Sequence, residues 1–152
     1  MSLQNISDEI VDSINAYSIK GMPNLLIAQC DDTNVRDFQI ARYETLLAAD
    51  ISAYRVEIQT NSATPNLYLA LSDLILETPS LQQQEKAAIT VLGVEKLRGA
   101  ARKVFVGNLE FKSTQLKKLP FTTVLWADRE TVIEIAGKAP SFYESTKGVF
   151  RF

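Results

Sequence analysis

Three carboxylates follow short apolar segments, at the positions where a parallel α/β sheet places its ligands. Asp31 and Asp32 come after residues 24–30, and Glu95 comes after residues 87–92. The carboxyl ends of parallel strands meet at one edge of the sheet, and carboxylate oxygens suit divalent cations. Asp31, Asp32 and Glu95 are therefore candidate metal ligands. The simpler interpretation, which we prefer, is that they are acids at helix starts, where capping and the helix dipole favour them.

The segment after the first apolar run is where a phosphate-binding loop would lie. Such a loop follows the pattern GxxxxGK[ST], because glycines let the backbone wrap the phosphates and the lysine reaches them. Residues 30–37 instead read Cys-Asp-Asp-Thr-Asn-Val-Arg-Asp, with neither glycine nor lysine. Two carboxylates there would repel a triphosphate. We therefore expect no ATP hydrolysis and no cofactor.

Other common chemistries lack the residues that they need. The chain contains no histidine and one cysteine, Cys30, which excludes Ser-His and Cys-His nucleophiles and histidine-ligated zinc. A lone cysteine at a strand end is usually a small buried apolar group. The pair Asp31-Asp32 also resembles the acidic pocket of response-regulator receiver domains. However, the segment 89–94 carries no aspartate to accept a phosphoryl group.

Length, composition and charge indicate one globular domain. The chain has 152 residues, of which 46% are hydrophobic and 22% charged, and its formal net charge is −2. A weakly negative protein is not expected to bind nucleic acid, and the basic segment 96–118 is typical of solvated helix faces. No apolar run reaches the roughly 20 residues of a membrane span. These features and the single cysteine predict a cytoplasmic protein without a membrane partner.

The hydrophobic pattern alternates between helical and strand-like segments. Short apolar or alternating runs predict strands at residues 24–30, 53–59, 87–92, 121–127 and 149–152. Helical spacing predicts helices at residues 3–18 and 131–138. It also predicts one helix from the caps at 31–34 to residue 50, and one from Thr64-Pro65 to Pro79. A further helical segment covers 94–119, with breaks near Gly99 and at Gly107-Asn108. Strands alternating with helices predict a three-layer α/β fold with a mostly parallel sheet of about five strands and helices on both faces.

Four segments together resemble a known family. They are 25–30 (LLIAQC), 89–97 (ITVLGVEKL), 121–126 (FTTVLW) and 138–152 (KAPSFYESTKGVFRF). In this order they resemble a degenerate P-loop NTPase-like domain, which stands at the N-terminus of bacterial, particularly cyanobacterial, tetratricopeptide-repeat and signalling proteins.

The resemblance implies the strand order 5-1-4-3-2, with residues 149–152 beside the first strand. It divides the chain into an N-terminal helix, 1–22, and the α/β domain, 23–152, as one domain in total. Because the phosphate-binding residues are missing, ATPase activity is not carried over. The expected function is a noncatalytic protein-interaction or regulatory module whose partners are other protein domains, including tetratricopeptide repeats of the same natural chain. The alternatives are a nucleotide- or metal-binding signalling domain with an unconventional site at the strand C-terminal ends, and an enzyme acting on a small molecule.

Overall fold

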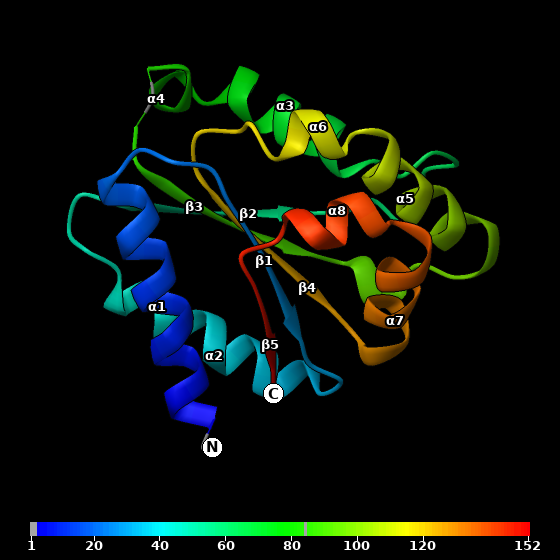
Figure 1. The fold of residues 1–152 in the computed structure, drawn as a ribbon, viewed down its shortest axis with the longest axis horizontal. Coiled ribbons are helices and arrows are strands. Elements are labelled where there is room, and N and C mark those ends of the chain that lie inside the picture. Colours follow the sequence, from blue (N-terminus) through cyan, green and yellow to red (C-terminus); the bar gives the residue numbers. More distant parts are fainter. Residues whose placement is uncertain (1–2, 84) are drawn as a thin grey trace.

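A five-stranded parallel sheet forms the centre of the protein (Figure 1). The computed structural model describes residues 3–83 and 85–152. The strands are β1 (Asn24–Gln29), β2 (Ser52–Glu57), β3 (Ala87–Leu92), β4 (Thr122–Ala127) and β5 (Gly148–Arg151). Their spatial order is β2-β3-β4-β1-β5, which confirms the predicted order read from the opposite edge.

Helices cover both faces of the sheet, as predicted. One face carries α1 (Leu3–Ile19) and α2 (Thr33–Leu46). The other carries α3 (Leu67–Glu77), α4 (Pro79–Gln82), α5 (Gly99–Phe111), α6 (Ser113–Leu116), α7 (Arg129–Lys138) and α8 (Pro140–Ser145). A short 3₁₀ helix, η1 (Val94–Lys96), joins β3 to α5. No helix in the described ranges is long and apolar enough to cross a membrane.

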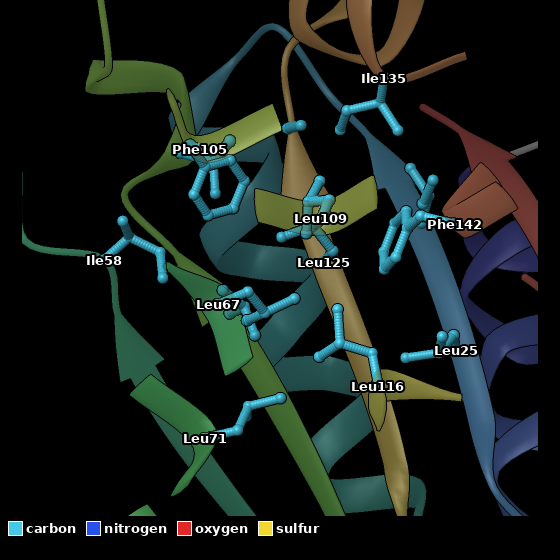
Figure 2. Packing of buried hydrophobic residues seen from close by; sticks show 14 of the residues in the cluster. Leu25, Ile58, Leu67, Leu71, Phe105, Leu109, Leu116, Leu125, Ile135 and Phe142 are labelled. Atoms are coloured by element: carbon cyan, nitrogen blue, oxygen red, sulfur yellow. The ribbon is translucent and has the colours of Figure 1, made fainter. Parts of the chain in front are cut away.

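The alternation of side chains along β1 explains why both faces are apolar. Leu25 and Ile27 point into the larger cluster, between the sheet and α3 to α8, whereas Leu26 and Ala28 point into the smaller one, under α1 and α2. Figure 2 shows Leu25 in the larger cluster, which gathers residues from several helices as well as from the strands. A strand buried on both faces has a continuous apolar sequence, which is why β1 could be predicted from the sequence.

The second predicted helix ends earlier than expected. We predicted it to reach residue 50, but α2 ends at Leu46. Beyond this point the backbone N–H of Ala48 donates a hydrogen bond to Oδ1 of Asn15 on α1, at 3.2 Å. The chain thus leaves the helix where a contact with α1 replaces an intrahelical bond, which a local pattern does not reveal.

Two features of the third and fifth helices also differ from the prediction. Helix α3 starts at Leu67 and not directly after Thr64-Pro65, because Asn66 is its N-cap and accepts the N–H of Leu69 at 3.2 Å. Helix α5 runs through Gly107 and Asn108 without a break. The side chain of Asn108 donates to the Pro65 carbonyl at 3.2 Å, so a tertiary contact holds the segment that looked like a break.

Candidate functional site

The turn between β1 and α2 lies where the sequence analysis placed a possible phosphate-binding loop. The carboxylate of Asp32 occupies the backbone N–H groups of this turn. Oδ1 of Asp32 accepts the backbone N–H groups of Asn34 at 2.8 Å and Val35 at 3.1 Å. The Asp32 carbonyl accepts the N–H of Arg36 at 2.9 Å. Free amides at a helix start are what attract a phosphate. Here two of these open amides, those of Asn34 and Val35, already have an acceptor, and a bound anion would also meet the Asp32 carboxylate.

Asp31 and Asp128 serve the neighbouring helix in a similar way. Oδ1 of Asp31 accepts the backbone N–H of Arg129, the first residue of α7, at 2.9 Å. Asp128 is the N-cap of α7 and accepts the N–H of Thr131 at 3.4 Å. Both contacts satisfy amides that the helix leaves open. The acids at this edge therefore act as helix caps, in line with the interpretation preferred from the sequence.

Glu95 forms an ion pair that crosses the sheet edge. It lies in η1, directly after β3, and its Oε1 accepts from Nη1 of Arg36 on α2 at 2.8 Å. The side chain of Arg36 is only 14% exposed and that of Glu95 only 18%. Burial opposes the charged form of Arg36, but the hydrogen bonds that it donates to Glu95 and to Asp37 outweigh this effect and raise the pKa of the guanidinium. Arg36 thus stays charged and neutralises Glu95.

The predicted metal ligands do not meet in one cluster. Asp32 caps α2, Asp31 binds the start of α7, and Glu95 pairs with Arg36. Within residues 3–83 and 85–152, no three His, Cys, Asp or Glu side chains gather closely enough to hold a metal ion. A metal site at these acids stays a prediction, and it would require Glu95 to leave Arg36.

Cys30 is buried at the end of β1. Its thiol lies 3.1 Å from the carbonyl oxygen of Asp32. Burial raises the pKa of this thiol, and the nearby Asp32 and Asp31 carboxylates add to the effect. A thiol that stays protonated is a poor nucleophile, which agrees with the packing role expected from the sequence.

Arg36 is the member of this site that the sequence analysis missed. It lies 59 positions from Glu95 in sequence, so no local spacing connects the two residues. The only available signal was an arginine one turn into the helix that follows β1. Its guanidinium is already paired with Glu95 and Asp37.

Replacing Arg36 with methionine is expected to lower the free energy of unfolding by about 1–2 kcal/mol, because a mostly buried carboxylate loses its partner. The variant Glu95→Gln and the double variant complete a double-mutant cycle, measured by urea denaturation. Arg55→Met is the matched control, since the pair Arg55–Glu44 leaves Arg55 51% exposed and should contribute less than about 1 kcal/mol. Equal losses at the two pairs would contradict the prediction.

Comparisons with known proteins bear on the fold alone. No family model matches the chain, and no curated protein matches it significantly. Among solved structures, the chain is similar to that of the ORC2 protein of Aeropyrum pernix in ADPNP-ADP complexes. The TM-score is 0.57 and the sequence identity is 11%. This match covers 96% of the chain and 46% of that structure. At such identity the likeness shows the fold alone: a three-layer α/β domain with a five-stranded parallel sheet.

A second structure, Rif2 in complex with the C-terminal domain of Rap1, gives a TM-score of 0.48 and 14% identity. The match covers 97% of this chain and 51% of that structure, and it is too distant to support an inference. In both comparisons the chain spans about half the length of the matched protein.

Proposed function

We propose that this protein is a noncatalytic interaction or regulatory module that retains an ATPase-type fold without its phosphate site. One observation carries the proposal: Asp32 occupies the amides at the start of α2 that a phosphate would need. The Arg36–Glu95 pair supports it, because Arg36 is the one cation among residues 30–37 and is already paired. Folds persist when their sites change, so function has to be argued from the site.

Exposed apolar side chains offer a surface for a protein partner. Phe111, at the end of α5, is 77% exposed, and Leu76 on α3 is 73% exposed. Lys112 lies over both the Phe111 ring, at 5.4 Å, and the Tyr68 ring of α3, at 5.3 Å, so the end of α5 adjoins the first turn of α3. Leu76 lies near the other end of α3, on the same side of the sheet. Exposed aromatic and aliphatic groups gathered on one face are typical of interaction surfaces.

Nucleotides are expected to leave the thermal unfolding midpoint unchanged. A ligand at 100 times its Kd stabilises the native state by about 2.7 kcal/mol, which for a domain of this size corresponds to roughly 5–10 °C. The chain should show no such rise with ADP or ATP and Mg²⁺ in differential scanning fluorimetry. A concentration-dependent rise of several degrees would contradict a noncatalytic module.

The second candidate is a nucleotide- or metal-binding signalling domain with an unconventional site. The exposure of Asp31 and Asp32 at the C-terminal edge of the sheet favours it. Mg²⁺ or Mn²⁺ alone would then raise the midpoint, and Asp31→Asn together with Asp32→Asn would remove the rise. Asparagine is also a good N-cap, so this variant should keep α2 folded and serves as a test of charge alone.

The finer parts of the proposal rest on the family resemblance. We propose that the partner is another protein domain, with tetratricopeptide repeats of the same natural chain as the first candidate, and that the protein acts in the cytoplasm in signalling. Binding of a purified repeat domain, measured by calorimetry, should weaken with Phe111→Ser and Leu76→Ser. Phe38→Ser is the control, because Phe38 is 67% exposed but lies on α2, on the opposite face.

A further inference from the structure

A hollow at the C-terminal edge of the sheet is lined by two arginines, Arg129 and Arg151. It lies between the ends of β1 and β5 and the helices α7 and α8 (Figure 1), and its volume is about 500 Å³. Its polar lining consists of Gln29, Arg129, Tyr143 and Arg151, and its apolar lining of Val132, Ile133 and Ala136. Pockets of this size accommodate small organic ligands.

The register of the strands shows that the polar groups are placed together. Gln29 of β1 is the register partner of Arg151 on one side and of Ala127 on the other. Along β1 and β5 the preceding residues on this face, Ile27 and Val149, pack against the larger core cluster. Both strands therefore change from apolar to polar at the same row.

The two arginines have no anionic partner within the described ranges. Arg129 is engaged only through its backbone N–H, to Asp31. The acids of α7 that could neutralise it, Glu130 and Glu134, face Arg102 of α5, at 3.8 and 2.9 Å. No side-chain hydrogen bond or ion pair of Arg151 is present in the described part of the chain, and the same holds for the Tyr143 hydroxyl and the Gln29 amide.

We propose that this hollow binds a small organic oxyanion, a phosphate or a carboxylate attached to an apolar group. Two guanidinium groups supply planar, paired donors that match such oxygens, and neither has an anionic partner to give up within the described part of the chain. The Tyr143 hydroxyl and the Gln29 amide add donors, while Val132 and Ile133 would contact the apolar part. The lining contains no residue of the β1–α2 turn, although Asp31 of that turn binds the backbone N–H of Arg129, and the proposal does not depend on the proposed function.

An NMR titration with phenyl phosphate and with benzoate tests the proposal and distinguishes the two anions. Amide shifts in ¹H–¹⁵N spectra should be saturable and centred on residues 29, 129–133 and 151, at millimolar Kd or tighter. If phosphate is the natural group, phenyl phosphate binds more tightly; if carboxylate is, benzoate does. Either result supports an oxyanion site.

Removal of one guanidinium should weaken binding about tenfold, so Arg129→Gln and Arg151→Gln are each expected to raise Kd by that factor and the double variant to abolish saturation. Both residues are exposed, so folding should persist; Arg151→Glu provides a second variant if it does not. Lys118→Gln, which removes one exposed charge elsewhere, should bind like the wild type. No saturable shift, or equal shifts in the double variant, would overturn the proposal.

Discussion

Replacing Trp126 with alanine is expected to lower the free energy of unfolding by about 3–5 kcal/mol, the cost of a large cavity in a packed core. Trp126 lies in β4, where every residue is buried, and it is itself 1% exposed. Its ring stacks on Tyr43 of α2 with centroids 6.5 Å apart, and on Phe152 with centroids 5.2 Å apart. The substitution therefore removes a contact between the sheet, a helix and residue 152.

Urea denaturation followed by far-ultraviolet circular dichroism is the measurement, because Trp126 is the only tryptophan and its fluorescence is lost in the variant. Trp126→Phe keeps an aromatic ring and should lose clearly less stability. Phe152→Ala removes only one partner of the stack and should fall between the wild type and Trp126→Ala. A loss below about 1 kcal/mol for Trp126→Ala would show that this aromatic stack is not a main part of the core.

Replacing Gly93 with alanine is expected to lower the free energy of unfolding by about 2–3 kcal/mol, since left-handed backbone strain adds to a steric overlap. Gly93 has φ +90°, and a Cβ atom there would lie 2.9 Å from the Ile58 carbonyl oxygen and 3.1 Å from Cγ of Glu57. The contacting oxygen belongs to backbone, so it cannot rotate away. Either β3 or the segment after β2 has to shift.

This substitution also tests the geometry of the candidate site. Gly93 is the N-cap of η1, which carries Glu95, so its displacement should reduce the coupling energy between Arg36 and Glu95 in the double-mutant cycle. Gly137→Ala is the control, because Gly137 lies in α7 with no atom within 4 Å of the added Cβ. That change should stabilise the protein by about 0.5–1 kcal/mol. Equal effects at the two glycines would contradict the role given to Gly93.

Much of the fold could be predicted from local patterns. The third strand has the predicted bounds, residues 87–92, because a short run of apolar residues before a glycine leaves few alternatives. Residues 53–59 were predicted as a strand from their alternating pattern, which is typical of a half-exposed strand, and β2 lies at the edge of the sheet. The strand order itself came from the family resemblance, since periodicity does not say which strands are neighbours.

The helix ends were harder to predict, and the reason is tertiary. Gly107 suggested a break, yet α5 continues through it, because Asn108 binds Pro65 and the helix packs on the sheet. Helix propensity differs among most residues by less than about 1 kcal/mol. One tertiary hydrogen bond and the burial beside it can therefore outweigh a local signal.

The residue types in the sequence determined which chemistries are excluded. Without histidine, and without glycine or lysine at residues 30–37, the groups required for histidine-dependent nucleophiles and for a GxxxxGK[ST] phosphate-binding loop are absent whatever the fold. The tertiary structure alone decided how the residues that are present are used. In the folded chain Glu95 pairs with Arg36, Asp31 accepts the first backbone N–H of α7, and Gln29 lies beside Arg151. Such contacts depend on strand register and on crossovers between distant segments, which local sequence patterns do not encode.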